Sequence, residues 1–255
     1  IYQYAGGVAA YSRDANPTIR NVHSYVNINN TCAGGRQGGI LGCASINDAN
    51  YRTTVENSIY SGTLDGNDAG GGGNYGGIVG YVNNSSANLV DITNCLFDGK
   101  VVNLNETPGG CTFGGVVGYN NGGKVTIKNC LSIGTVSAAE NKYGQFFGAL
   151  NGNNSTFVNS YYVGDFINGA SNGGKASGTV PRKVDDAQLA SGEITWMLNE
   201  EEFLDAVWRQ DIGYDDYPLP TSVGAFVYLS PDGYARNYES KPETFYPFRD
   251  AVIAM

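Results

Sequence analysis

Short apolar blocks that follow a pair of glycines recur along most of the chain. Five such blocks align with one another: AGGVAAY from Ala5, GGILGC from Gly38, GGIVGY from Gly76, GGVVGY from Gly114 and the degenerate GQFFGA from Gly144. After a loop of variable length each is followed by a second block: TIRNVHSYVNI, TVENSIYSGTL, DITNCLFDGKV, TIKNCLSIGTV and TFVNSYYVGDF. Self-similarity at a period of about 30 to 38 residues predicts a repeat architecture.

The second block keeps a fixed frame around an asparagine. This residue is Asn21, Asn57, Asn94, Asn129 and Asn159 in successive repeats. An apolar residue stands two positions before it, often with a polar residue between, which is the period of two of a strand with one buried face. Five positions after it, four of the five repeats have a glycine: Gly62, Gly99, Gly134 and Gly164. We interpret this glycine as a corner at which the chain turns into another short strand.

A unit of this length holds one circuit of three short strands with corners, and it cannot bury its apolar face alone. Stacked units share one continuous core. We therefore predict an all-β fold, a right-handed parallel β-solenoid of about five coils over residues 1–180. The handedness follows from the general preference for right-handed parallel crossovers. A β-propeller is the alternative, but its blades need four strands and somewhat more residues.

Stacking of the repeats gives the recurring asparagines a structural explanation. Side-chain amides at equivalent corners can pass hydrogen bonds along the axis, so we interpret the five asparagines as a structural ladder. Cys95 and Cys130 directly follow their asparagines, where other repeats have Val22, Ser58 and Ser160. This position calls for a small residue, and nothing there requires a thiol.

Composition supports the all-β prediction and argues against several classes of partner. Glycine accounts for 37 of the 255 residues, which suits short strands joined by turns. Apolar residues make up 41% of the chain, enough for a buried core. A formal net charge of -9 lacks the basic surface that nucleic acid requires, so we expect no nucleic-acid partner. Without an apolar run of about 18 residues, we expect no membrane insertion in this segment.

The chain lacks the residue clusters that metal or cofactor chemistry needs. Its five cysteines, Cys32, Cys43, Cys95, Cys111 and Cys130, form no close pair; we interpret them as small buried residues, with a single disulfide as the alternative. One histidine and no CxxC pair leave a thiolate or imidazole site short of ligands. GGGNYG from Gly71 matches a dinucleotide-binding pattern, but an expected strand follows it instead of a helix. We predict no cofactor, no metal and no catalytic residue.

The repeat pattern, GG(I/V)VGY followed by (I/V)(T/K)NC, resembles the GLUG repeat. That repeat occurs in large secreted and surface proteins of bacteria, including adhesin-like proteins and non-catalytic parts of some immunoglobulin A peptidases. The run LASGEITWMLNEEEFLDAVWRQDIGYDDYPLP from Leu189 is similar to a segment that commonly follows such repeats in surface proteins of anaerobic gut bacteria. The end repeats depart from the pattern, with Ala10 for the third glycine of the first and Gln145 for the second glycine of the last. Covering most of residues 5–220, the resemblance implies a secreted or cell-surface protein, with this chain as part of a larger polypeptide.

The composition changes after the glycine-rich stretch NGASNGGKASG from Asn168. We predict that residues 181–255 form a C-terminal cap and tail. A helix over about 185–198 is indicated by acidic residues at its start and apolar residues along one side. A hairpin over about 224–237 is indicated by Pro231-Asp232-Gly233. A cap is expected because a solenoid end leaves an unpaired strand edge and an open core.

Ligand contacts are expected on outward side chains and on loops. The position three after the asparagine holds Tyr60, Phe97 and Tyr162, which would form a partial aromatic ladder for sugars or proteins if they face outward. The alternative is that they lie in the core. Variable loops near 29–37, 65–75, 103–113 and 137–143 are expected at one corner of successive coils, where repeat proteins commonly make contacts.

These features together favour a non-catalytic structural or adhesive module, secreted or at the cell surface, whose partners are host or bacterial glycans or surface proteins. The alternative is a carbohydrate-active β-helix enzyme, a polysaccharide lyase or a glycoside hydrolase, because such folds can carry paired carboxylates. Charged residues such as Asp98, Lys100, Lys128 and Asp165 are spread over the repeats, which argues against the enzyme. Two carboxylates, or a carboxylate with Arg or Lys, in a groove beside one coil would favour it.

Overall fold

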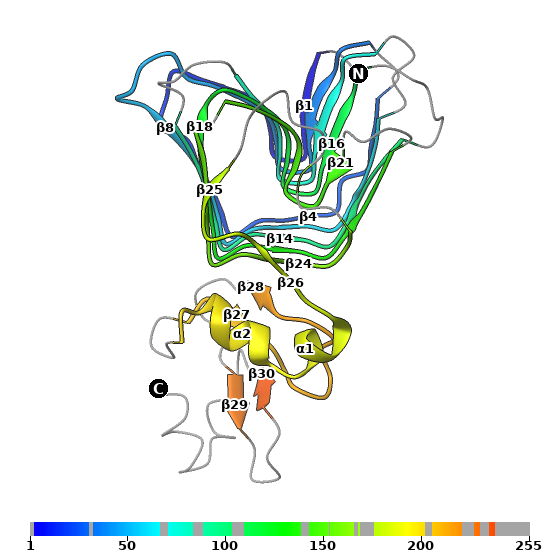
Figure 1. Ribbon diagram of the computed structural model, residues 1–255, viewed down its shortest axis with the longest axis vertical. Helices are drawn as coiled ribbons and strands as arrows, with labels where there is room; N and C mark the ends of the chain where they lie inside the picture. Colours follow the sequence, from blue (N-terminus) through cyan, green and yellow to red (C-terminus); the bar gives the residue numbers. More distant parts are fainter. Residues whose placement is uncertain are drawn as a thin grey trace. The chain divides into compact units, whose positions relative to one another are not determined.

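The fold contains two compact units, Ile1–Arg182 and Lys183–Met255. The computed structural model describes residues 3–30, 33–66, 71–83, 89–103, 110–138, 143–152, 154–165, 168, 176–201, 206–220, 227–229 and 235–237. In the first unit, strands of successive repeats pair in parallel and form five stacked sheets (Figure 1). The predicted all-β parallel solenoid is confirmed, and its right-handed winding stays a prediction.

Each sheet is made of equivalent strands from successive repeats. Sheet A contains β1 (Tyr4–Gly6), β6 (Arg36–Gly38), β11 (Asn74–Gly76), β16 (Thr112–Gly114) and β21 (Tyr143–Gly144). Sheet B contains β2 (Ala9–Arg13), β7 (Leu41–Ser45), β12 (Val79–Val82), β17 (Val117–Asn121) and β22 (Phe147–Asn151). Sheet C contains β3 (Thr18–Arg20), β8 (Arg52–Glu56), β13 (Leu89–Thr93), β18 (Lys124–Lys128), β23 (Ser155–Val158) and β25 (Ser177–Gly178). Sheet D contains β4 (His23–Ser24), β9 (Ile59–Tyr60), β14 (Leu96–Phe97), β19 (Leu131–Ser132), β24 (Tyr161–Tyr162) and β26 (Arg182–Lys183). Sheet E contains β5 (Ile28–Asn29), β10 (Thr63–Asp65), β15 (Lys100–Val102) and β20 (Thr135–Ser137).

A coil passes through sheets A, B, C, D and E in that order, so it has five short strands where the sequence predicted three. The corner between sheets A and B turns inward, toward sheet D (Figure 1). The variable segments all connect a strand of sheet E to the next strand of sheet A, as expected of loops at one corner. Residues 31–32, 67–70, 104–109 and 139–142 of these loops lie outside the described residues.

The inward corner explains the recurring glycines. A Cβ atom on Gly77 would lie 2.2 Å from the carbonyl oxygen of Gly115 and 2.4 Å from Cδ2 of Phe97. One on Gly80, the third glycine of the block, would lie 2.4 Å from the carbonyl oxygen of Gln37 in the preceding repeat. Backbone segments here approach more closely than any side chain permits, so the glycine pattern is a steric requirement of the corner.

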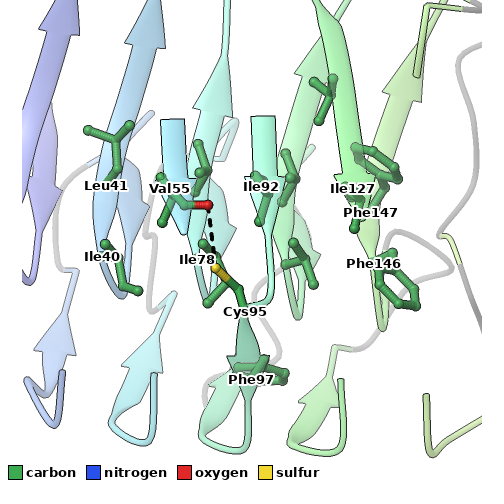
Figure 2. Close-up of a cluster of buried hydrophobic side chains, with 14 of the residues drawn as sticks. Ile40, Leu41, Val55, Ile78, Ile92, Cys95, Phe97, Ile127, Phe146 and Phe147 are labelled. Carbon is green, nitrogen blue, oxygen red and sulfur yellow. Dashed lines mark hydrogen bonds between the residues drawn. The ribbon is translucent and has the colours of Figure 1, made fainter. Parts of the chain in front are cut away.

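Apolar side chains from all the coils form one continuous core (Figure 2). On sheet C, Val55, Ile92 and Ile127 stand in register in neighbouring coils and are fully buried. The thiol of Cys95 joins this stack and donates a hydrogen bond of 3.5 Å to the carbonyl oxygen of Val55. Each repeat thus buries its apolar face against its neighbours, which is how a unit too small to fold alone is stabilised.

The recurring asparagines occupy a strained corner and connect coils. All have positive φ, from 43° at Asn159 to 56° at Asn21. The Asn94 amide donates to Oδ1 of Asn57 at 3.1 Å, and the Asn159 amide to Oδ1 of Asn129 at 2.9 Å. Asparagine tolerates the left-handed conformation better than most residues, and its amide reaches the next coil. The position therefore has two physical requirements, of which the sequence indicated the second.

The residue after each ladder asparagine donates to the carbonyl two residues before it in the last four repeats. The donors are Ser58, Cys95, Cys130 and Ser160. The position thus favours a small side chain that also carries a donor, which is why either serine or cysteine stands there in these four repeats. Cys43, Cys95, Cys111 and Cys130 are buried, as expected. Cys32 lies outside the described residues.

The second unit begins with two short helices, α1 (Asp186–Ala190) and α2 (Glu193–Leu198), where the sequence predicted one. The chain breaks between them because Gly192 adopts a left-handed φ of 86°. Strand β27 (Trp208–Arg209) pairs with β28 (Leu219–Pro220), and β29 (Val227–Leu229) with β30 (Ala235–Asn237), both antiparallel. The predicted turn at 231–233 lies outside the described residues, and the role of this unit as a cap stays a prediction. No helix among the residues described is long and apolar enough to cross a membrane.

Candidate functional site

The three aromatic residues predicted as ligand contacts lie in the core. Tyr60 and Phe97 are 0% exposed and Tyr162 is 7% exposed. The rings of Tyr60 and Phe97 stack with their centroids 6.4 Å apart. A Cβ atom on Gly39 would lie 2.2 Å from Cγ of Tyr60, so this ring fills the space behind the inward corner. The prediction of an outward aromatic ladder is therefore wrong, and the alternative, that these residues lie in the core, is confirmed.

The left-handed corner at the ladder asparagine explains why these aromatic residues point inward. Val55 and Tyr60 stand five positions apart and both are fully buried. An uninterrupted strand would place them on opposite faces. Asn57 lies between them with a φ of 49°, and this left-handed corner shifts the alternation by one residue.

Another set of tyrosines lies on the other face of sheet B, beside the inward corner, where Tyr11 is exposed, Tyr119 is half-buried and Tyr81 is buried. The residue that ends each glycine block forms a row in parallel register: Tyr11, Cys43, Tyr81, Tyr119 and Ala149. A second row, two positions further along the chain, contains Arg13, Ser45, Asn83, Asn121 and Asn151. A third row crosses the facing sheet A and contains Tyr4, Arg36, Asn74 and Thr112. We call these three rows the tyrosine-asparagine strip.

Hydrogen bonds centred on Asn121 fix the tyrosines of the strip. The Asn121 amide donates to the Tyr81 hydroxyl oxygen at 2.8 Å, and its Oδ1 accepts from the Tyr119 hydroxyl at 3.1 Å. The Asn151 amide also donates to Oδ1 of Asn121, at 3.2 Å. The rings of Tyr81 and Tyr119 meet edge to face, with centroids 5.8 Å apart. The two rings are therefore held in one arrangement before any ligand arrives.

Arg36 contacts residues of the strip on both sheets, A and B. Its Nη1 donates to the Tyr4 hydroxyl oxygen at 3.1 Å, and its guanidinium carbon lies 4.0 Å from the centroid of the Tyr81 ring. Burial raises the pKa of the Cys43 thiol to about 11, although the neighbouring Arg36 acts to lower it. Burial also raises the pKa of Tyr81. The Cys43 thiol and the Tyr81 phenol beside the arginine are therefore neutral at pH 7.

The strip combines aromatic rings with side-chain amides. Tyr11 is 41% exposed, and Tyr119, Asn121 and Asn151 are half-buried. Aromatic faces pack against the C–H faces of sugars, and amides hydrogen-bond to their hydroxyl groups. Sequence analysis missed this set although a signal was present, because the tyrosine that ends GGIVGY was taken only as part of the repeat pattern.

A chain of hydrogen bonds runs along sheet D through the first three coils and joins Tyr25, His23, Ser61 and Asp98. The Tyr25 hydroxyl lies 2.8 Å from Nδ1 of His23, and Nε2 of His23 lies 2.7 Å from Oγ of Ser61. The Ser61 hydroxyl donates to Oδ1 of Asp98. The single hydroxyl proton of Ser61 is thus used by Asp98, and His23 must donate to the serine instead of accepting from it.

This order differs from that of a nucleophile activated by a base, in which the histidine accepts the serine proton and the carboxylate orients the histidine. Burial lowers the pKa of His23 against the attraction of Asp98, so the ring is neutral at pH 7. The arrangement does not support acyl transfer by Ser61.

The two carboxylates described on sheet C, Asp91 and Glu56, stand in different rows of the sheet. Nη1 of Arg52 forms an ion pair with Oδ2 of Asp91. In the row of Asp91, the neighbouring coils present Thr54 and Thr126. Glycosidases use two carboxyl groups across the scissile bond, and the other carboxylate of sheet C, Glu56, stands in a different row, between Arg20 and Thr93. In the part of the chain that the structure describes, no group of three or more His, Cys, Asp or Glu residues gathers to hold a metal.

Comparisons with known proteins add no assignment. No family model matches the chain, and no curated protein or solved structure matches it. The resemblance to the GLUG repeat therefore stays a prediction, as does the bacterial surface location that it implies.

Proposed function

We propose that the chain is a non-catalytic adhesive module, secreted or at the cell surface, that binds carbohydrate through the tyrosine-asparagine strip. The observation that carries the proposal is the in-register stacking of tyrosine and amide side chains on the outer faces of sheets A and B. The partners would be host or bacterial glycans, free or attached to surface proteins.

The geometry suits an extended ligand that lies across the strands. Neighbouring strands in a sheet are about 4.8 Å apart, so a chain of sugars would meet a tyrosine or an amide in four of the five coils and Arg36 in the other. The bonds from Asn121 to Tyr81 and Tyr119 support this proposal, because rings that are already fixed lose little freedom on binding. The variable loops lead directly into the strands of sheet A. Their residues differ between coils and can therefore add different contacts to the ligand.

A glycan array tests the proposal, with a pull-down of host surface proteins in parallel. We expect the wild-type chain to bind a defined subset of glycans, and Tyr119→Ala to weaken that binding about tenfold, in the range seen for aromatic contacts at interfaces. Tyr25→Ala is the matched control, because this tyrosine is 65% exposed but lies off the strip. An array and a pull-down that both stay blank would contradict the proposal and leave a spacer function.

The second candidate is the carbohydrate-active enzyme. The Arg52–Asp91 ion pair favours it, because this pair sets a carboxylate beside an arginine on sheet C. Incubation with the polysaccharides that the chain binds, followed by measurement of new reducing ends and of unsaturated products, separates the two functions. We expect neither product. Product formation that Asp91→Asn abolishes would replace the adhesive module by the enzyme.

A further inference from the structure

Arg36 is a half-buried cation that no carboxylate neutralises in the described residues. The ion pairs within those ranges are Arg13 with Asp14 and Arg52 with Asp91. The chain has 24 acidic residues against 15 basic ones, so carboxylates that could pair with an arginine are plentiful in the sequence. The three rows of the strip contain arginine at Arg13 and Arg36 and no Asp or Glu.

The row in which Arg36 stands shows that the arginine is a local departure from the repeat. The two following coils place Asn74 and Thr112 at the equivalent position. These two side chains satisfy each other, since the Thr112 hydroxyl donates to Oδ1 of Asn74 at 3.0 Å. The fold therefore does not require a cation at this position.

Among the described residues, the neighbours of Arg36 hold the guanidinium but leave most of its donors free for a ligand. A guanidinium group carries five N–H donors in a planar fork. One bonds to the Tyr4 hydroxyl, and another faces the Cys43 thiol. The Tyr81 ring lies 4.0 Å away and the Tyr4 ring 5.5 Å away, and neither ring is an acceptor of comparable strength. A planar fork with free donors is the group that best matches a carboxylate, through two parallel hydrogen bonds.

We propose that Arg36 binds the carboxylate of an acidic sugar, so that the ligand of the strip is a glycan that contains uronic or sialic acid. This inference rests on the proposed function, because the tyrosines and amides of the neighbouring coils bind the adjoining sugars. The carboxylate receives two charge-assisted hydrogen bonds from the guanidinium, and the neutral Cys43 thiol and Tyr81 phenol nearby add no opposing charge. Binding accordingly weakens as the salt concentration rises.

Two pairs of probes test the inference, each with and without the carboxylate. Oligogalacturonate is compared with its carboxyl-reduced form, and sialyllactose with lactose, by titration calorimetry at low salt. We expect the acidic member of at least one pair to bind about tenfold or more tightly than its neutral partner, a difference of about 1.4 kcal/mol. Whichever pair shows the difference identifies the source of the carboxylate.

Variants of Arg36 assign the preference to this residue. Arg36→Gln is expected to abolish the difference and to leave binding of the neutral member within about twofold. Arg36→Lys keeps the charge but loses the planar fork, so it should retain part of the preference, and it serves if the glutamine variant is unstable. Arg182→Gln is the matched control, because Arg182 also lies 5.5 Å from a tyrosine ring, that of Tyr161, but is off the strip.

The outcomes separate the two proposals. Equal binding of both members of each pair, or an acid preference unchanged in Arg36→Gln, would overturn the role of Arg36 while sugar binding stands. Absence of binding by all four probes, together with a blank glycan array, would remove the proposed function as well.

Discussion

The ring of Phe97 lies against Gly77, so closely that a Cβ atom on the glycine would be 2.4 Å from Cδ2 of the ring. This contact connects the two blocks of the repeat, because the glycine belongs to the inward corner and the ring to sheet D. The same relationship recurs between Gly39 and Tyr60. The large aromatic residues thus support the inward corner from inside, and the outer side of that corner becomes the strip.

Replacement of Gly77 by alanine tests the steric account of the corner. The new methyl group would also meet the carbonyl oxygen of Gly115 at 2.2 Å, a backbone atom that cannot move independently. We expect Gly77→Ala to lower the free energy of unfolding by about 3 kcal/mol or more, measured by urea denaturation.

Gly72→Ala is the control for the loss of glycine alone. Gly72 has a φ of 87° and no atom near its missing Cβ, so alanine there should cost only about 1 to 2 kcal/mol of conformational strain. Equal destabilisation by the two alanines would contradict a steric role for the corner glycines.

The repeat itself could be predicted from the sequence because stacking forces equivalent residues into register. The double glycines and the asparagine frame therefore predicted a parallel solenoid. The direction in which Tyr60 and Phe97 point could not be predicted, because the left-handed conformation of Asn57 and Asn94 interrupts the alternation on which such an inference depends. The strip was missed for a related reason, since the inward turn that sets Arg36 of sheet A against Tyr81 of sheet B depends on contacts between coils.

Two substitutions at Asn94 separate its two roles. Asn94→Gly keeps the left-handed corner and removes only the amide bond to Asn57, which should cost about 1 kcal/mol. Asn94→Ala removes the bond and also strains the backbone, so we expect about 2 to 3 kcal/mol in total. Thermal and urea unfolding should rank wild type above glycine and glycine above alanine. An alanine variant as stable as the glycine variant would show that the left-handed φ is not a constraint.

Alkaline pH should destabilise the chain through Cys43. Burial raises the pKa of this thiol to about 11, whereas an unfolded cysteine titrates near about 8.5. Between these values the unfolded chain has lost the proton and the folded chain has kept it, so the free energy of unfolding falls as pH rises. The stabilisation is complete below about pH 8.5, and about 2 kcal/mol of it should be lost by about pH 10.5.

Urea denaturation at both pH values measures this loss, and Cys43→Ser supplies the comparison. Burial also raises the pKa of Cys95 and Tyr60, so the serine variant keeps part of the slope and the difference between the two proteins reports Cys43. The same pH dependence in wild type and Cys43→Ser would exclude this cause.

Asn121 should matter for binding more than for folding. Its side chain holds Tyr81 and Tyr119, so Asn121→Ala frees both rings and removes an amide from the strip. We expect the affinity for the best glycan to fall about fivefold to tenfold, with a loss of stability of about 1 kcal/mol. Asn50→Ala is the control, because this exposed amide also bonds to a neighbour, Oδ1 of Asp48 at 2.9 Å, but lies off the strip. Equal affinities of the two variants would argue against a role of the strip in binding.

A crystal structure with the best oligosaccharide from the array tests the central claim most directly. The account predicts density for sugars along the outer faces of sheets A and B, in contact with Tyr81, Tyr119 and Asn121 and with a carboxylate at Arg36. Sugar density elsewhere, for example over the threonines of sheet C, with the strip empty, would contradict it.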